Sequence, residues 1–302
     1  MCVIIIHKNN TILMKSKRKG IILAGGSGTR LHPITKSISK QLIPIYDKPM
    51  IYYPLSALMM ANIDNVLVIS SPEHIELYKV LLGNGARLGM KIEYKIQESP
   101  NGLAEAFILG EDFIGDSPVA LILGDNLFYG HDFSKILASA DSIQNKSTIF
   151  AYRVANPKRF GVVEFDKNGD VLSVEEKPEF PKSPYAITGL YFYDNDVIQI
   201  AKSISPSIRG EIEITDVNKI YLEENKLRVE ILRKGFAWLD TGTPESLMQA
   251  SHFIYTLDKI QGVKVLCPEE IAYRNKWIDK NHLMNLANEY ENSYNQYLKS
   301  LL

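Results

Sequence analysis

Cysteine is scarce in this sequence of 302 residues, which contains only Cys2 and Cys267. Two cysteines cannot build a disulfide framework, and neither has the neighbours that a zinc site requires. Small disulfide-stapled folds and zinc modules are therefore excluded. The low cysteine content fits a reducing compartment, and we expect a cytoplasmic protein.

An excess of charge of one sign is also absent. The chain has 34 Lys and Arg residues against 35 Asp and Glu residues, which gives a formal net charge of -1. A surface that neutralises many nucleic-acid phosphates needs a strong positive excess. We therefore expect no nucleic-acid partner.

Long hydrophobic runs are missing as well. The apolar run at residues 3–6 is too short for a signal-peptide core and has no positive residue before it. No other segment approaches the length of a membrane span. We therefore expect no membrane partner, and the chain also lacks internal repeats and low-complexity linkers.

The hydrophobic content of 45% is ample for a core, and its distribution predicts an α/β fold. Short apolar runs bounded by turn residues predict strands at residues 20–24, 65–70, 91–96, 119–125 and 147–154. Helical patterns lie between them at residues 71–82, where Ser71 is placed to cap, and at 101–113. Apolar strands that alternate with helices indicate a mainly parallel sheet covered on both faces.

The second half of the chain is richer in strands. Residues 160–178 predict two strands joined by a hairpin turn at Asn168 and Gly169. Further strands are expected at residues 185–194, 226–232 and 236–240. A helix is expected from residue 243, because Thr243 is a natural N-cap and Pro244 suits the first turn.

The segment LAGGSGTRLHP at residues 23–33 predicts an anion-binding loop after the first strand. Its residues Gly25, Gly26, Gly28 and Thr29 let backbone N–H groups approach a phosphate closely. Arg30 adds a planar fork that can hold two phosphate oxygens. The alternative is a tight turn with a solvated Arg30.

Two common phosphate-binding loops do not match this segment. It lacks the Gly-Lys-Ser/Thr ending of a P-loop. A dinucleotide fingerprint would need a third glycine where Leu31 stands, and an acidic residue where the second strand ends in Ser70. A dinucleotide oxidoreductase is therefore disfavoured.

Eight segments carry a resemblance to a known family. They are residues 23–33, 40–55, 123–133, 162–166, 175–178, 188–194, 209–218 and 237–243, among them LGDNLFYGHDF, EEKP and AWLDTGT. The chain resembles the sugar-nucleotide nucleotidyltransferases from about residue 19 to its end, and within them the members that use dTTP and glucose 1-phosphate. The resemblance implies one domain over residues 19–302, with residues 1–18 as an N-terminal extension. Met14 is as good a starting residue as Met1.

The resemblance implies a Rossmann-like sheet, a β-rich sugar-binding insertion and a helical C-terminal segment. It also implies a reaction in which dTTP and glucose 1-phosphate give dTDP-glucose and pyrophosphate. Such phosphoryl transfer depends mainly on positioning and charge neutralisation. Members are typically tetrameric, so we expect a homotetramer.

Two carboxylates are candidate Mg²⁺ ligands. Asp125 follows a strand at the sheet edge where ligands of open α/β folds gather, although an Asp there is often only a turn residue. Asp240, just before Thr243, offers a second carboxylate. The resemblance makes both of them Mg²⁺ ligands.

The resemblance assigns the remaining site residues by their motifs. Arg30, Lys40, Asp125 and Lys177 are the expected catalytic residues. The expected nucleotide-binding residues are Leu23, Gly25, Gly26, Gly28, Thr29, Gln97 and Gly102. The expected sugar-phosphate residues are Gly161, Glu176, Lys177, Arg209 and Trp238.

Local chemistry supports several of these roles. The Gln97 amide can pair with a pyrimidine edge, and Gly102 lets the backbone approach the ring. Lys177 suits a phosphate, and Pro178 should hold the backbone before it extended. The alternative for Lys177 is an exposed ion pair at a hairpin end.

The sequence departs from the family pattern at Glu98, where proline is usual, and at Phe160, where tyrosine is common. The first departure concerns the base-binding loop, and the second removes a hydroxyl near the sugar site.

A second ligand site is also implied. His131, Glu270 and Arg274 lie in segments that resemble a regulatory site for a nucleotide sugar, so we expect feedback inhibition by dTDP-rhamnose. The alternative is ordinary surface charge.

Two rival functions remain open. One is a uridylyl- or cytidylyltransferase of the same superfamily. The other is a non-catalytic nucleotide-sugar sensor, which would have no need to retain both carboxylates and the phosphate-binding cations. The absence of a C-terminal hexapeptide repeat disfavours the bifunctional acetylglucosamine and ADP-glucose types.

Overall fold

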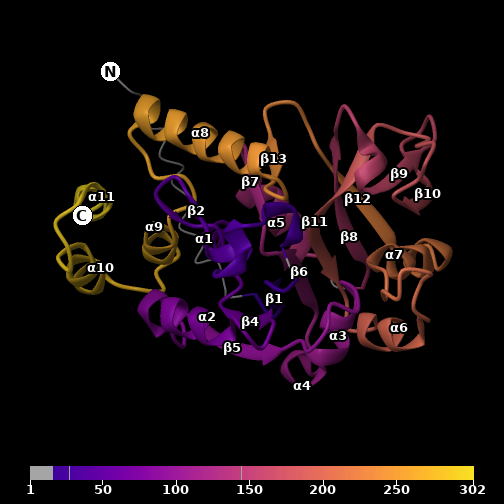
Figure 1. Ribbon diagram of the computed structural model, residues 1–302, viewed down its shortest axis with the longest axis horizontal. Helices are drawn as coiled ribbons and strands as arrows, with labels where there is room; N and C mark the ends of the chain where they lie inside the picture. The colour runs from indigo at the N-terminus through magenta and orange to yellow at the C-terminus, as the bar shows by residue number, and fades with distance from the viewer. Residues whose placement is uncertain (1–15, 27, 144) are drawn as a thin grey trace.

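The computed structural model describes residues 16–26, 28–143 and 145–302 of the chain. Its centre is a sheet in which four strands run parallel in the order β5, β4, β1, β6 (Figure 1). Their bounds are β1 Lys19–Leu23, β4 Asn65–Ser70, β5 Lys91–Ile96 and β6 Val119–Leu123. The strands predicted from the apolar runs are confirmed, and their carboxyl ends share one edge of the sheet.

The sheet continues beyond β6 through β11 (Tyr185–Tyr193), which is antiparallel to it. On its other side β11 pairs with β8 (Ser147–Arg153), and β12 (Leu227–Leu232) runs parallel to β8. The hairpin of β9 (Gly161–Phe165) and β10 (Val171–Glu176) also joins β11. The fold is therefore the predicted mainly parallel α/β sheet with a β-rich addition.

The predicted turn of this hairpin is confirmed. Gly169 adopts a φ of 89°, which favours glycine. The Asp166 carboxylate accepts the backbone N–H groups of Asn168 and Asp170, each at 2.8 Å. Such Asx-type bonds are typical of tight turns.

The remaining strands of the described residues form two separate two-stranded ribbons. Strands β7 (Asn126–Tyr129) and β13 (Ala237–Asp240) are antiparallel, with Asp240 opposite Asn126. Strands β2 (Pro44–Ile45) and β3 (Lys48–Pro49) form the other ribbon. The β7–β13 pairing connects segments more than 100 residues apart in sequence, close to the carboxyl end of β6.

Helices cover both faces of the sheet. They are α1 Tyr52–Met60, α2 Ile75–Leu82, α3 Glu105–Leu109, α4 Glu111–Ile114, α5 Phe133–Asp141, α6 Val197–Ser203, α7 Ile214–Glu223, α8 Pro244–Gln261, α9 Pro268–Arg274, α10 Lys280–Ala287 and α11 Ser293–Ser300. Short 3₁₀ helices are η1 Thr29–Leu31, η2 Ile34–Lys36, η3 Lys40–Leu42, η4 Ala86–Leu88 and η5 Pro157–Arg159. Alternate strand residues belong to two separate cores, with Ile22 and Ile122 in one and Ile21 and Leu121 in the other. A strand that is buried on both sides accounts for the continuous apolar runs.

The C-terminal helices α10 and α11 lie at the end of the molecule opposite the β9–β10 hairpin (Figure 1). Helix α8 begins as predicted, because Thr243 and Ser246 form a capping box and Pro244 is in the first turn. Among the described residues, no helix is both long enough and apolar enough to cross a membrane.

Two predicted helix bounds are wrong. Helix α2 begins at Ile75 rather than directly after the predicted cap Ser71, because residues 71–74 form a turn in which Ser71 contacts His74 Nδ1 at 3.0 Å. The helix predicted over residues 101–113 is divided into α3 and α4 at Gly110. A Cβ at Gly110 would lie 2.9 Å from the Ala106 carbonyl oxygen, so the close packing there needs glycine.

The predicted N-terminal extension needs one correction. Residues 1–15, which include Cys2 and Met14, lie outside the described residues. Arg18, however, is buried, and its guanidinium donates to Asp141 at 2.8 Å and to the Val119 carbonyl at 3.1 Å. Arg18 therefore belongs to the domain, because a buried charge is stable only when it is paired and hydrogen-bonded.

Candidate active site

Two adjoining cavities open at the carboxyl edge of the central strands. The Trp238 cavity has a volume of about 280 Å³, and the Gln97 cavity has a volume of about 200 Å³. Leu103, Leu123, Asp125 and Glu211 line both of them. Two ligands, one in each cavity, would therefore meet beside Asp125. Ligands of open α/β sheets bind at this edge.

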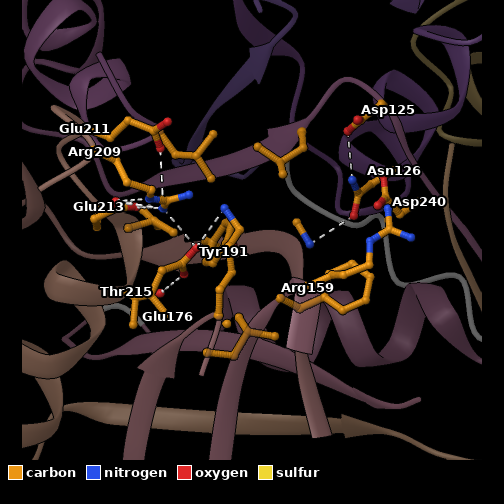
Figure 2. A pocket seen from close by; sticks show the side chains of 18 of the residues that line it. Asp125, Asn126, Arg159, Glu176, Tyr191, Arg209, Glu211, Glu213, Thr215 and Asp240 are labelled. Carbon is orange, nitrogen blue, oxygen red and sulfur yellow. Dashed lines mark hydrogen bonds and ion pairs between the residues drawn. The ribbon is translucent and has the colours of Figure 1, made fainter. Parts of the chain in front are cut away.

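The predicted carboxylate pair lies at one end of the Trp238 cavity, and Asp125 also lines the Gln97 cavity (Figure 2). Asp125 follows β6, and Asp240 ends β13. Thr241 joins the two segments, since both its N–H and its hydroxyl donate to the Asp125 carbonyl, at 3.2 and 2.9 Å. The β7–β13 ribbon thus holds two carboxylates together that the sequence separates widely.

The electrostatics of this pair favour a bound cation. Burial raises the pKa of the Asp240 carboxyl, and the neighbouring Asp125 carboxylate raises it further. The charges of Lys40, Arg30 and Arg159 oppose this effect. Lys40, which is nearly buried, forms an ion pair with Asp125.

No group of three or more His, Cys, Asp or Glu side chains gathers as a metal site within the described residues. Two carboxylates nevertheless fit Mg²⁺, because this ion keeps several waters and shares its remaining ligands with phosphate oxygens. They fit zinc poorly, since zinc usually takes at least three protein ligands.

The glycine loop places Arg30 in the Trp238 cavity. A Cβ at Gly242 would lie 3.1 Å from Arg30 Nη2, so Gly242 leaves the space that the guanidinium occupies. Gly28 has a φ of 56°, and a Cβ there would lie 2.8 Å from Thr35 Cγ2. Glycine is therefore required for the turn that directs Arg30 toward the cavity.

The predicted nucleotide-binding residues divide into two groups. Leu23, Gly25, Gly26, Gln97 and Gly102 line the Gln97 cavity. Gly28 and Thr29 shape the loop but are not among the lining residues of either cavity. The predicted group is thus brought together only in part.

Two further features shape the Gln97 cavity. A Cβ at Gly102, where φ is 111°, would lie 2.4 Å from the Ile212 carbonyl oxygen. Gln41 also lines the cavity, and its buried side chain accepts a hydrogen bond from Ser39 Oγ at 2.9 Å. Sequence reasoning missed Gln41, although it directly follows Lys40 in a family-like segment.

Lys177 and Glu176 both line the Trp238 cavity, as expected. The Lys177 backbone, however, is not extended: its φ is 43°, and its N–H donates to the Phe160 carbonyl at 3.1 Å. The prediction from Pro178 is therefore wrong, because this hydrogen bond to Phe160, the residue before β9, outweighs the usual restriction before proline. Strained non-glycine backbone is common at functional sites. The Lys177 ammonium is half exposed and lies 3.3 Å from Glu176 Oε1.

Arg209 lies among three carboxylates at the opposite end of the cavity (Figure 2). Its Nη2 is 2.7 Å from Glu213, 3.3 Å from Glu176 and 3.5 Å from Glu211. Burial lowers the pKa of Arg209, but the hydrogen bond to Glu213 and the surrounding carboxylates raise it overall. The guanidinium is therefore engaged by protein carboxylates. Sequence reasoning missed Glu211 and Glu213 although they lie in the same RGEIEITD motif.

Two polar side chains that the sequence did not single out, Thr215 and Asn126, form hydrogen bonds with predicted site residues. Thr215 donates to Glu176 Oε2 at 2.6 Å. Asn126 donates to Asp125 at 2.9 Å and accepts the Trp238 indole N–H at 2.6 Å. Asn126 could have been found, since it directly follows Asp125 in LGDN.

The apolar wall of the Trp238 cavity is aromatic. The Trp238 and Phe160 rings lie 5.1 Å apart, and Gly161 follows Phe160 in the lining. The departure from the family pattern at residue 160 therefore faces the cavity and removes a hydroxyl from its wall.

Arg159 is a cavity residue that sequence reasoning missed. It ends η5, is exposed, and lines the Trp238 cavity on the same side as Asp240 (Figure 2). No carboxylate within the described part of the chain forms an ion pair with it. The only signal in the sequence was its place two residues before Gly161.

A third cavity of about 740 Å³ lies between β7, α5, α9 and α11, and we call it the Arg274 cavity. Glu270 and Arg274 line it and form an ion pair of 2.6 Å. His131 is not among its lining residues and lies 3.4 Å from Asp132, although its neighbour Gly130 lines the cavity. Two of the three predicted regulatory residues are thus together.

Comparisons with known proteins show the family to which this chain belongs. A model of the family described as nucleotidyl transferase matches residues 19–256. A Neisseria meningitidis glucose-1-phosphate thymidylyltransferase is 56% identical over 285 residues, covering 94% of this chain and 99% of the relative. The Mycobacterium tuberculosis protein of the same name is 55% identical with the same coverage.

Two solved structures are also similar. A Bacillus anthracis protein described as a glucose-1-phosphate thymidylyltransferase, in complex with sucrose, is 38% identical with a TM-score of 0.73, covering 78% of this chain and 94% of its own. A UDP-glucose pyrophosphorylase complexed with UDP-glucose is 26% identical with a TM-score of 0.71, covering 80% of this chain and 99% of its own.

Proposed function

The chain belongs to the nucleotidyl transferase family, and on that premise we propose that it joins dTTP and glucose 1-phosphate to give dTDP-glucose and pyrophosphate. One observation carries the proposal: two cavities of different chemistry meet at Asp125. The Gln97 cavity offers an amide and glycine backbone for a nucleotide. The Trp238 cavity offers cations and hydrogen-bonding side chains for a sugar phosphate.

The reaction needs two phosphates of like charge to approach each other. A phosphate oxygen of glucose 1-phosphate attacks the α-phosphorus of dTTP, and the bond from that phosphorus to the bridging oxygen breaks, which leaves its electron pair on pyrophosphate. Arg30, with Lys40 near it, neutralises the triphosphate. Because Arg30 remains charged throughout, it stabilises the charge that grows on the departing pyrophosphate.

Asp125 and Asp240 would hold Mg²⁺, which supplies charge neutralisation at the phosphate oxygens when it is bound. This assignment is supported by the mutual proximity of the two carboxylates and by the raised pKa of Asp240. Asn126 holds the Asp125 carboxylate through its amide at 2.9 Å.

At the other end of the Trp238 cavity, Glu176 and Thr215 would bind sugar hydroxyls, with Trp238 and Phe160 against the ring. Lys177 would bind the phosphate of the sugar. Arg209 would bind it only if it leaves its partner Glu213, so we assign Lys177 the main role. Electrostatic binding before attack lowers KM for the sugar phosphate.

A second candidate function is uridylyl transfer, which the similarity to a UDP-glucose pyrophosphorylase favours. A non-catalytic sensor is disfavoured because Arg30, Lys177, Asp125 and Asp240 all line one cavity. A protein that only binds its ligand does not need both carboxylates.

We also propose that the Arg274 cavity binds dTDP-rhamnose as a feedback inhibitor, and that the protein is a cytoplasmic homotetramer that supplies dTDP-deoxysugar synthesis. The volume of this cavity and its Glu270–Arg274 pair support a polar ligand with an apolar part.

Pyrophosphate release tests the main proposal. It should be measured with dTTP, UTP, CTP, ATP and GTP against several sugar 1-phosphates. We expect the highest kcat/KM for dTTP with glucose 1-phosphate. Preference for UTP would favour the second candidate, and the absence of release with every pair would favour the sensor.

A further inference from the structure

We infer that Glu105 is a positioning residue for base selection, because it holds the Gln97 amide in one orientation and so favours thymine and uracil over cytosine. This inference rests on the proposed nucleotidyl transfer and names a determinant of its base preference. Glu105 is the first residue of α3 and does not line either cavity of the site.

The orientation of the Gln97 amide follows from its partner. Gln97 is only 6% exposed, and its Nε2 donates to Glu105 Oε2 at 2.6 Å. A carboxylate has acceptors only, so the amide nitrogen must face Glu105. With the amide reversed, its oxygen would face the carboxylate oxygen, and a buried acceptor would lose its partner.

Glu105 is itself held in place. Asn101 Nδ2 donates to Glu105 Oε1 at 2.9 Å, so each carboxylate oxygen has one amide donor. Glu105 also lies in the first turn of α3, where a negative charge is favoured. The carboxylate is therefore a stable reference for the Gln97 side chain.

The other end of the amide is directed at the ligand. Gln97 lines the cavity, and a Cβ added at Gly25 would lie 3.0 Å from Gln97 Oε1. The Gln97 carbonyl oxygen therefore lies beside the glycine loop, and the amide nitrogen lies on the side of α3. A base entering this cavity meets an acceptor and a donor in a fixed order.

This order distinguishes the pyrimidines. Thymine and uracil have an N3–H donor beside a carbonyl acceptor, whereas cytosine has an N3 acceptor beside an amino donor. A base of the first kind can give its N3–H to Gln97 Oε1. Cytosine in the same position would place N3 against that oxygen, and an unmade polar contact in a closed site costs substantial affinity.

Substituting Glu105→Gln should remove this selection. A glutamine at residue 105 has both a donor and an acceptor, so it can bond to Gln97 in either orientation. We expect the ratio of kcat/KM for dTTP to that for dCTP to fall by about tenfold, the size of one hydrogen bond to a buried group. The ratio for dTTP to dUTP should stay the same, because both bases present the same edge.

The saturating kcat with dTTP should change little, since Glu105 does not reach the phosphates. Glu111→Gln is the matched control, because it removes the same charge from α4. Glu111 forms an ion pair of 2.5 Å with Lys202 and does not line either active-site cavity. This variant should keep the wild-type dTTP to dCTP ratio.

Asn101→Ala gives an independent test, since it removes the second donor to Glu105 without altering the carboxylate. We expect a smaller fall in the same ratio. A wild-type dTTP to dCTP ratio in Glu105→Gln overturns the inference. If Glu105→Gln does not fold, a wild-type ratio in Asn101→Ala overturns it instead. Wild-type protein that makes no dTDP-glucose would instead contradict the proposed function.

Discussion

The two ends of the Trp238 cavity contrast in how their charges are balanced (Figure 2). At one end Asp125 and Asp240 lie together, with the guanidinium of Arg159 on the same side. At the other end Arg209 is paired with Glu213 at 2.7 Å, and Thr215 bonds to Glu176. At the first end Lys40 pairs with Asp125, but Asp240 and Arg159 form no ion pair within the described residues, so their charges are available to ligands. The charges of the second end are already balanced by ion pairs and hydrogen bonds within the protein.

This contrast separates chemistry from recognition. Phosphoryl transfer needs groups that compensate changing charge, so carboxylates and cations must remain available to metal and phosphates. Recognition of sugar hydroxyls needs acceptors in fixed positions, and mutual hydrogen bonds within the protein hold them there. Substitutions at the two ends should therefore affect kcat and KM differently.

The largest effect is expected at the carboxylate pair. Asp125→Asn should lower kcat by about 1000-fold or more, because an amide lacks the charge that holds Mg²⁺. Removal of divalent cations with a chelator should have a comparable effect and should be reversed by added Mg²⁺. Steady-state pyrophosphate release measures both, with exposed Asp116→Asn as the control. Near-normal rates in Asp125→Asn at low millimolar Mg²⁺ would contradict the assignment.

Arg30→Ala should come next, with kcat lowered by about 100-fold or more and KM for either substrate changed much less. The reason is that its contact strengthens as charge moves to pyrophosphate. Lysine should restore little of the loss, because it lacks the planar fork. Lys36→Ala changes another cation of the same loop, exposed on η2, and should be nearly neutral. A rise in KM without a fall in kcat would assign Arg30 to ground-state binding instead.

Lys177→Met should show the opposite kinetic pattern. We expect KM for glucose 1-phosphate to rise much more than KM for dTTP, with a loss of about 2 to 4 kcal/mol in kcat/KM. Circular dichroism and dTTP binding should first establish that the variant is folded. Lys182→Met is a matched control, because Lys182 is also exposed and pairs with Glu175 at 2.5 Å. Normal use of glucose 1-phosphate would move the phosphate-binding role to Arg209.

The smallest effect on basal activity is expected at the Arg274 cavity. Arg274→Ala should weaken inhibition by dTDP-rhamnose while leaving the uninhibited rate nearly unchanged, because Arg274 lies outside both active-site cavities. Inhibition curves for the wild type and the variant measure this effect. Identical curves would mean that the Glu270–Arg274 pair is ordinary surface charge.

The local pattern of the chain was sufficient for the strands and for the start of α8. Continuous β-branched runs suit strands that are buried on both faces, and Thr243 with Pro244 marks a helix start by chemistry within four residues. The two wrong helix bounds have different origins: a local turn over residues 71–74 delays the start of α2, whereas at Gly110 a Cβ would lie close to the Ala106 carbonyl and to side chains of β1 and β4. Similarly, Arg18 was assigned to the extension because its partner Asp141, with which the buried Arg18 guanidinium pairs, is distant in sequence.

The site residues divide in the same way. The family-like motifs assigned Arg30, Asp125, Lys177 and Asp240 to the site, whereas the local sequence by itself left Asp125 open as a turn residue and Lys177 as an exposed ion pair. They could not show that Asp240 lies beside Asp125, since that depends on the β7–β13 pairing. Nor could they show that Arg209 is held by Glu213, or that Arg159 lines the cavity, because exposed charges carry no local signal of their partners.

The class of fold and the residue types of the site could therefore be read from the chain, because apolar periodicity and turn chemistry act over a few neighbouring residues. Which of those side chains meet, how the Lys177 backbone turns to bond to the Phe160 carbonyl, and which way the Gln97 amide faces depend on the folded molecule. These features differ from the first because hydrogen bonds and ion pairs form between segments that the fold brings together. Their geometry depends on every element that packs against them.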